Sequence, residues 1–200
     1  MALNRTAYVV LGMLSIEPNK SGYDIRKAVE GSVGHFWGES YGQIYPTLKR
    51  LAAEGLIVAN NAPSTSSKKR QEYSLTEAGQ TCLEEWLALP FQNDPPRNEF
   101  LLKLFFGRDV PLRISIAHVR DCQEKNRQML ATLTGFEEMI RKQASLNAHA
   151  PFWTLTLELG IALTRTGLEW CDHALATLLF MQSEEAIGKR HGETVAATGN

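Results

Sequence analysis

Cysteine is scarce in this chain of 200 residues, and the spacing of its three cysteines argues against a disulfide framework or a zinc site. Cys82, Cys122 and Cys171 are odd in number, far apart and without a Cys-x-x-Cys pair. The five histidines form no closely spaced ligand pair either, so we expect structural or surface histidines and no bound metal. Unpaired cysteines suit the reducing environment of the cytoplasm.

Long uninterrupted hydrophobic runs are also missing. The N-terminus lacks the basic and then apolar pattern of a signal peptide. The apolar stretch near the C-terminus is interrupted by four charged residues, namely Glu158, Arg165, Glu169 and Asp172. Because a membrane-spanning helix needs about 20 mostly apolar residues, we expect a cytoplasmic protein that does not cross a membrane.

Neither sign of charge is in excess, since 21 Lys and Arg residues oppose 22 Asp and Glu residues. A formal net charge of −1 excludes a uniformly basic nucleic-acid binder but permits a local basic patch. Catalytic motifs are missing too, because no nucleophile with a base, carboxylate pair or phosphate-binding glycine loop has a recognisable spacing. We therefore expect no enzymatic activity and no cofactor.

A helix with clear limits is predicted over residues 40–55. Ser40 and Gln43 have the spacing of a capping box, and Gly55 can supply the left-handed residue that ends a helix. Buried side chains are expected at helical spacing, at Ile44, Leu48 and Leu51, with Ala52 beside them. The opposite side carries Gln43, Pro46, Lys49, Arg50 and Ala53, with Ser40 and Thr47 at its edge. Taken alone, this pattern fits a solvated amphipathic helix and a DNA-reading helix equally well.

Pro46 is predicted to lie several residues inside this helix. There its missing N–H costs the hydrogen bond to the carbonyl of Gly42, and its ring crowds that carbonyl. Such a local defect would let the first turn bend or open, which suits a helix end that approaches another molecule closely.

Two shorter helices are predicted before this one. Residues 4–16 are apolar almost all round, as in a helix buried between other elements. A second helix is expected to start at Ser21, an N-cap with Asp24 in its first turn, and to continue through Phe36. Three short helices with a tight connection before the third have the layout of a helix-turn-helix.

A β-hairpin is predicted directly after these helices. Residues 56–59 and 71–75 have strand composition, and the polar segment between them carries Lys68, Lys69 and Arg70. Five of the nine basic residues within 1–90 therefore lie at 49–50 and 68–70. A hairpin behind a helix-turn-helix is a wing, whereas the same segment taken alone would be a solvated loop.

The domain organisation follows from the breaks in the pattern. A fourth helix, 77–89, is expected to be capped by Thr76 and to face inward with Ala78, Cys82, Leu83, Trp86 and Leu87. Pro90, Pro95 and Pro96 then indicate a linker. We predict a winged-helix domain at 1–90, a linker at 91–98, a helical domain at 99–182 and a flexible polar tail at 183–200.

Two long helices with heptad spacing are predicted in the second domain, after a short apolar helix at 99–107. The first, 112–146, would be about 52 Å long, and the second spans roughly 152–182. Their apolar seams could pack on each other within one chain, but we favour a two-fold homodimer. The candidate dimerisation residues are Val119, Asn126, Met129, Leu133, Phe136, Leu157, Ile161, Leu168 and Leu175. Asn126, polar within its seam, would set the register.

The predicted fold class is thus mainly α with a small β-hairpin. An N-terminal winged helix-turn-helix domain is followed by a C-terminal α-helical dimerisation domain with long coiled-coil-like helices.

Several segments resemble the PadR family of transcriptional regulators. They are Tyr-Val-Val-Leu-Gly-Met-Leu (8–14), Ser-Gly-Tyr-Asp-Ile (21–25), Phe-Trp (36–37), Gln-Ile-Tyr-Pro-Thr-Leu-Lys-Arg-Leu (43–51), Glu-Gly-Leu-Ile (54–57) and Tyr-Ser-Leu-Thr-Glu-Ala-Gly (73–79). Asn-Glu-Phe-Leu-Leu-Lys-Leu-Phe-Phe (98–106), followed by two long helices, is similar in pattern to the longer members, which include phenolic-acid-responsive repressors.

The resemblance implies a homodimer that binds a two-fold operator in double-stranded DNA, usually as a repressor. It places these residues at the DNA: Tyr23, Ser40, Tyr41, Gln43, Tyr45, Lys49, Lys68, Lys69 and Arg70. Their chemistry agrees for Gln43, Lys49 and the wing, because amides read base edges while Lys and Arg neutralise phosphates. Tyr23 and Tyr45 fit packing in the head equally well.

The resemblance also implies that some members release DNA when a small aromatic effector binds. The effector candidates are Tyr41, Trp153 and Trp170, and the two tryptophans fit core or seam packing better. Tyr41 differs from the polar residue or histidine often found at its position in the phenolic-acid branch. The alternative functions are a protein-docking winged helix and a ligand-binding protein without DNA binding. A protein-docking module would predict an acidic or apolar wing, and this wing is basic.

Overall fold

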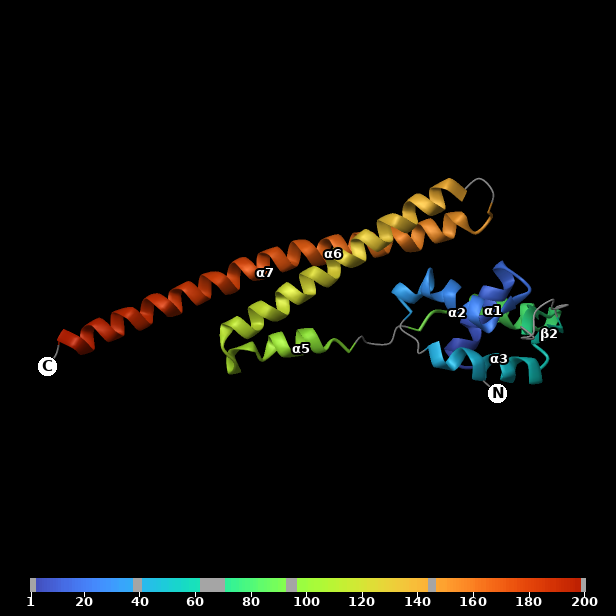
Figure 1. Cartoon of the computed structure of the whole chain (residues 1–200), viewed down its shortest axis with the longest axis horizontal. Helices are drawn as coiled ribbons and strands as arrows, with labels where there is room; N and C mark the ends of the chain where they lie inside the picture. Colours follow the sequence, from blue (N-terminus) through green and yellow to red (C-terminus); the bar gives the residue numbers. More distant parts are fainter. Residues whose placement is uncertain (1–2, 38–40, 62–70, 93–96, 144–146, 199–200) are drawn as a thin grey trace, which may run out of the picture. The chain divides into compact units, whose positions relative to one another are not determined.

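The computed structural model describes residues 3–37, 41–61, 71–92, 97–143 and 147–198 (Figure 1). The chain divides into two compact units, Met1–Asp94 and Pro95–Asn200. Among these described residues, no helix is both long and apolar enough to span a membrane.

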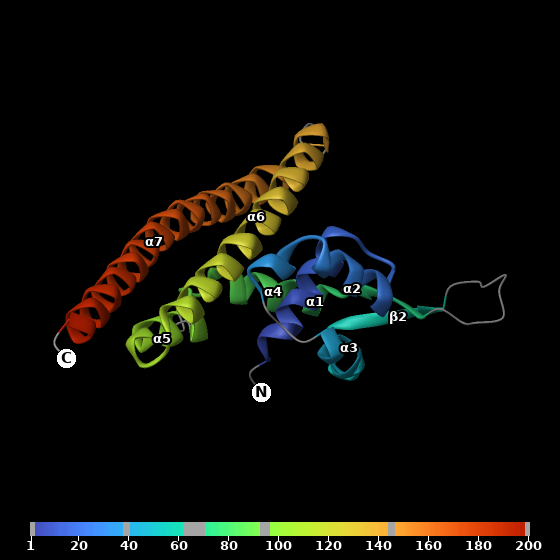
Figure 2. The ribbon, with the colours of Figure 1, turned by 60° about the vertical axis from the view of Figure 1, so that its left-hand side comes forward.

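The first unit combines short helices with a small antiparallel sheet. Its elements are α1 (Arg5–Ile16), β1 (Lys20–Ser21), α2 (Gly22–Glu30), α3 (Ile44–Ala53), β2 (Ile57–Asn61), β3 (Gln71–Leu75) and α4 (Glu77–Ala88). Short 3₁₀ turns lie at Val33–His35 and Tyr41–Gln43. The sheet order is β1-β3-β2, and strand β2 lies beside the first-unit helices in Figure 2.

Local sequence signals set most of the helix ends. Ser21 is the N-cap of α2, as predicted, and accepts from the N–H of Asp24. The Asp24 carboxylate also accepts from the N–H of Ser21 at 3.1 Å, which completes a capping box that was not predicted. Thr76 caps α4 through the N–H of Gly79. Gly55 has a φ of +72°, and the N–H of Leu56 donates to the carbonyl of Leu51 at 2.9 Å. This Schellman motif confirms the predicted end of the third helix.

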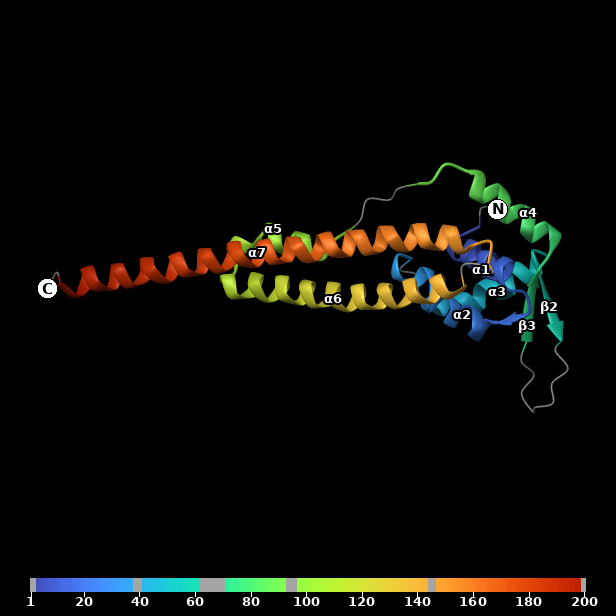
Figure 3. The same ribbon diagram turned by 90° about the horizontal axis from the view of Figure 1, so that it is seen from above.

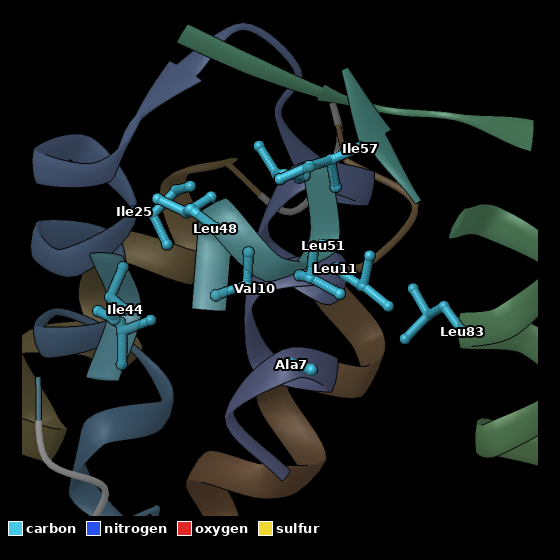
Figure 4. Close-up of a cluster of buried hydrophobic side chains, with 11 residues drawn as sticks. Ala7, Val10, Leu11, Ile25, Ile44, Leu48, Leu51, Ile57 and Leu83 are labelled. Atoms are coloured by element: carbon cyan, nitrogen blue, oxygen red, sulfur yellow. The ribbon is translucent and has the colours of Figure 1, made fainter. Parts of the chain in front are cut away.

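The core of the first unit surrounds α1. Its buried side chains are Ala7, Val10, Leu11, Leu14, Ile25, Val29, Ile44, Leu48, Leu51, Ile57 and Leu83 (Figure 4). Helices α2, α3 and α4 and strand β3 all pack on α1. This enclosure explains why α1 is apolar on nearly every side.

Three expectations for this unit are corrected. Helix α2 ends at Glu30, and Phe36 is 63% exposed, because the chain leaves the helical path at Gly31. Helix α4 buries Gly79 and Leu83, whereas Ala78 and Leu87 are exposed. Strand β1 was not predicted, since two residues are too few for a recognisable alternation.

The second unit consists of α5 (Glu99–Phe105), a 3₁₀ turn (Gly107–Asp109), α6 (Leu112–Gln143) and α7 (Ala150–Thr198). Helices α6 and α7 lie side by side and antiparallel, and α7 continues past the beginning of α6 (Figure 3). The expected flexible tail is corrected, because α7 extends to Thr198. Residues 183–198 contain many good helix formers, among them Glu, Ala and Lys.

The two predicted seams pack on each other within one chain. Leu133 of α6 is buried against Leu157 and Ile161 of α7, with Met129, Phe136 and Ile140 packed around them. Val119 is also fully buried. These seam residues therefore have partners within the chain, as in the alternative that the sequence left open. Which residues join two copies stays a prediction.

Polar residues fix the register of this helix pair. Asn126 lies over Gly167, where an added Cβ would come within 3.2 Å of its Nδ2 atom. Gln123, which is buried, donates from Nε2 to Oδ1 of Asp172 at 2.5 Å. Sliding α7 by one turn would separate both pairs, so the register depends on them.

All three cysteines are free thiols. Burial, and then contact with Cys122, raises the pKa of Cys171 to about 11. A thiolate is the reactive form of cysteine, so Cys171 is protonated and inert at neutral pH.

Two glycines test this packing in opposite directions. Gly79→Ala should lower the unfolding free energy by about 3 kcal/mol or more, because the added Cβ would overlap the carbonyl oxygen of Leu56. Gly12→Ala should raise it by about 0.5–1 kcal/mol, because Gly12 lies inside α1 with open space at its Cβ. Urea unfolding measures both, and equal effects would contradict the close approach of α4 to Leu56.

Candidate nucleic-acid interface

The beginning of α3 differs from its prediction. The chain enters through the 3₁₀ turn Tyr41–Gln43, and the α-helix starts at Ile44 with Gln43 at the N-cap position. The α-helix therefore starts later than predicted, and Gln43 makes no side-chain cap for it. The predicted capping box between Ser40 and Gln43 stays a prediction. Ser40, its other predicted member, lies outside the described residues.

Pro46 explains this helix start. It is the third residue of α3, a position whose N–H has no partner within a helix. A helix beginning at Tyr41 would instead need that N–H for the carbonyl of Gly42. Pro46 is therefore compatible with the first turn, and the expectation of a defect inside the helix is wrong.

Helix α3 separates a buried side from an exposed side. Ile44, Thr47, Leu48 and Leu51 are buried, so Thr47, expected at the exposed edge, belongs to the core. The exposed side carries Gln43, Tyr45, Pro46 and Lys49. An amide and an ammonium group thus lie about 1.7 turns apart along the same helix.

The neighbouring bases Lys49 and Arg50 have different surroundings. Arg50 donates from Nη2 to Oδ1 of Asn4 at 2.8 Å, and the same oxygen caps α1 by accepting from the N–H of Ala7. Lys49 is exposed and forms no ion pair with any residue that the structure describes. Arg50 therefore links α3 to α1, while Lys49 remains available to a ligand.

The ring of Tyr45 lies against the beginning of α2, at the glycine that precedes Tyr23. An added Cβ on Gly22 would come within 2.7 Å of Cε1 of Tyr45, so the ring of Tyr45 lies against this glycine. Tyr45 is nevertheless 52% exposed, and Tyr23 beside Gly22 is 55% exposed. Tyr45 thus packs on α2 with part of its ring and presents the rest to solvent. Sequence reasoning missed Gly22, although a glycine in the first turn of a helix signals close approach.

Two other bases near the helix-turn-helix are paired. The Nζ atom of Lys20 lies 2.6 Å from a carboxylate oxygen of Glu17, and this hydrogen bond raises the pKa of Lys20. Arg26 pairs with Glu30 at 3.0 Å. On α3, Lys49 is therefore the base that an outside anion can reach, because Arg50 is held by Asn4.

The remaining DNA candidates cannot be placed. Lys68, Lys69 and Arg70 lie outside the described residues, as does the side chain of Tyr41. Strands β2 and β3 end at Asn61 and Gln71, so the basic segment connects these two ends. The structure thus brings together Tyr23, Gln43, Tyr45 and Lys49 from the predicted set.

The effector candidates do not form one pocket within the second unit. Trp153 stacks on His149 with ring centroids 5.9 Å apart, and Trp170 meets Phe100 edge to face at 5.8 Å. Seventeen residues of helix separate the two tryptophans by about 26 Å. Two hollows among the described residues of this unit, of about 440 and 340 Å³, are lined by other side chains.

A helix-turn-helix followed by a β-hairpin defines the first unit as a winged helix, a class of DNA-binding domain. Residues 10–85 match the family model described as Transcriptional regulator PadR-like family, and residues 96–178 match Virulence activator alpha C-term. Residues 10–85 are thus a domain of the PadR-like family of transcriptional regulators.

Relatives of known structure or function cover nearly the whole chain. The negative transcriptional regulator PadR of Bacillus subtilis is 29% identical over 176 residues, covering 86% of this chain and 96% of that protein. Its crystal structure in complex with operator DNA matches with a TM-score of 0.75 and 28% identity, over 88% of this chain and 99% of that chain. The structure of the Vibrio cholerae virulence activator AphA matches with a TM-score of 0.68 and 28% identity, over 88% of this chain and 99% of that chain.

Replacing Arg50 and Lys49 in turn should show that Arg50 stabilises the fold and Lys49 does not. Arg50→Ala should lower the unfolding free energy by about 1 kcal/mol, because it removes the hydrogen bond to Asn4. Lys49→Ala should change the unfolding free energy by less than about 0.5 kcal/mol, as expected for an exposed residue. Urea unfolding compares the two variants, and equal losses would contradict the assigned roles.

Proposed function

We propose that this chain represses transcription by binding a two-fold operator in double-stranded DNA as a homodimer. The observation that carries this proposal is the exposed side of α3, where Gln43 and Lys49 lie on a helix held rigidly by the core. The operator complex of B. subtilis PadR, similar over 88% of this chain, supports it. The protein acts by binding and not by chemical turnover, and its DNA partner implies a cytoplasmic location.

In this proposal α3 enters the major groove. The Gln43 amide can donate to and accept from one base edge, which gives sequence preference. Lys49 and the wing bases Lys68, Lys69 and Arg70 neutralise phosphates and supply affinity that depends on salt. The exposed part of the Tyr45 ring, together with Tyr23, would lie beside the DNA that α3 contacts.

We propose that the second copy covers an apolar stripe on α7. Phe152, Leu155, Leu159 and Leu163 recur at helical spacing and are 60–68% exposed, although α6 covers the other side of α7. Water-exposed apolar stripes of this kind mark association surfaces. A two-fold pair formed this way would present two α3 helices to successive major grooves, about 34 Å apart.

An aromatic effector would act by favouring a dimer geometry in which this spacing is wrong. The crystal structure of B. subtilis PadR in complex with p-coumaric acid, at 28% identity over 87% of this chain, supports an effector of this class. Because coupling between two ligands is reciprocal, the effector should lower operator affinity by the same factor as operator lowers effector affinity.

Substitutions on α3 should separate affinity from sequence preference. Lys49→Ala should weaken binding to all duplexes alike and reduce the salt slope by about 1, because one phosphate contact is lost. Gln43→Ala should relax the preference at one base pair by about 1–3 kcal/mol. Mobility shifts with a duplex selected from a random pool measure both, with Lys103→Ala in α5 as the control. If the unsubstituted chain selects no duplex, DNA binding is not its function.

The dimer surface can be tested separately. Leu159→Glu should shift the protein from dimer to monomer, because it places a charge in the centre of the apolar stripe. Leu87→Glu, on an equally exposed leucine of α4, should leave the dimer intact. Analytical ultracentrifugation distinguishes these results, and a Leu159→Glu protein that stays dimeric would place the interface elsewhere.

A further inference from the structure

We propose that Asn19, Asn60 and Ser74 form a positioning site that aims the wing, the β2–β3 hairpin, at DNA. This inference rests on the proposed DNA-binding function and adds three residues to its machinery. None of the three is charged, and none belongs to the predicted DNA-contacting set.

The three side chains form a closed hydrogen-bonded ring. Nδ2 of Asn60 donates to Oδ1 of Asn19 at 2.6 Å and to Oγ of Ser74 at 2.8 Å. Oγ of Ser74 donates to Oδ1 of Asn19 at 2.9 Å and accepts from the N–H of Asn19 at 3.2 Å. Both N–H groups of the Asn60 amide and the hydroxyl of Ser74 are thereby used, and Oδ1 of Asn19 accepts twice. A hydrogen-bonded network whose donors all have acceptors is more rigid than one in which some donors have none.

The ring connects all three strands of the sheet. Ser74 lies on the central strand β3, Asn60 on the edge strand β2, and Asn19 immediately before the opposite edge strand β1. Strand β1 itself pairs only through Lys20 with Tyr73 and Ser21 with Glu72. A two-stranded ribbon twists easily, so a hairpin with such a short third strand needs a further restraint on its direction.

Asn19 ties this restraint to the rest of the head. Its φ of +59° lies in the left-handed region, which costs about 1 kcal/mol for a residue other than glycine and is tolerated best by asparagine and aspartate. The ring holds Asn19 in this conformation, in the short turn between α1 and β1. Because α1 is the centre of the core, the ring links the direction of the wing to the element on which α3 also packs.

The ring and the bases of the wing should therefore act on DNA affinity as one unit. The bases supply charge, which is screened by salt, whereas the ring supplies direction through neutral hydrogen bonds. Removing the ring should leave the bases charged but poorly aimed, so their contribution to affinity would be lost without any change in net charge.

A double-mutant cycle tests this coupling. Asn60→Ala should weaken binding to the selected duplex about tenfold, and Ser74→Thr, which keeps the hydroxyl, should restore most of what Ser74→Ala loses. In a Lys69→Ala background, Asn60→Ala should weaken binding less than twofold. A wing that already lacks the Lys69 charge loses less affinity when its direction changes. Gln80→Ala, which removes a 2.6 Å amide hydrogen bond to Glu84 on α4, is the matched control.

Footprints separate positioning from a general loss of structure. Asn60→Ala should lose the protection outside the α3 half-sites while protection of the α3 major groove persists. Loss of both protections together, additive effects with Lys69→Ala, or affinity equal to that of Gln80→Ala would overturn the inference while leaving DNA binding intact. If the unsubstituted chain selects no duplex, both the proposed function and this inference fail.

Discussion

The burial of α1 is the constraint on which the head depends. This helix has core side chains on nearly every side because α2, α3, α4 and β3 pack around it. The exposed side of α3 is therefore defined by what α3 must bury against α1, namely Ile44, Leu48 and Leu51. A substitution in α1 would alter how α3 is held without touching any DNA candidate.

The same packing explains why neighbouring polar residues have different uses. Arg50 turns toward Asn4 and completes the cap of α1, whereas Lys49, one residue earlier, faces solvent. Tyr45 can lie against residue 22 because that residue is glycine; a side chain there would collide with the Tyr45 ring. Neutral contacts inside the head thus decide which of these polar side chains face solvent.

In the second unit, packing within the chain decides which surface is left for association. The heptad seams of α6 and α7 satisfy each other, around Leu133, Leu157 and Ile161. The opposite side of α7 keeps the apolar stripe defined by Phe152, Leu155, Leu159 and Leu163. A dimer built on that stripe would use residues of α7 next to the predicted dimerisation residues, such as Leu157 and Ile161, which face α6.

Signals that act over a few residues were readable from the sequence alone. The N-cap at Ser21, the cap at Thr76, the turn at Gly55 and the hairpin strand at 71–75 each depend on hydrogen bonds or alternation within one segment. The family resemblance and the spacing of Gln43 and Lys49 on one helix side were equally accessible. Tertiary structure alone decided the burial of Thr47, the exposure of Phe36, the partner of the heptad seams and the ring at Asn19, Asn60 and Ser74. Those features depend on which distant segments meet, and a periodic pattern specifies that a side is buried without specifying what covers it.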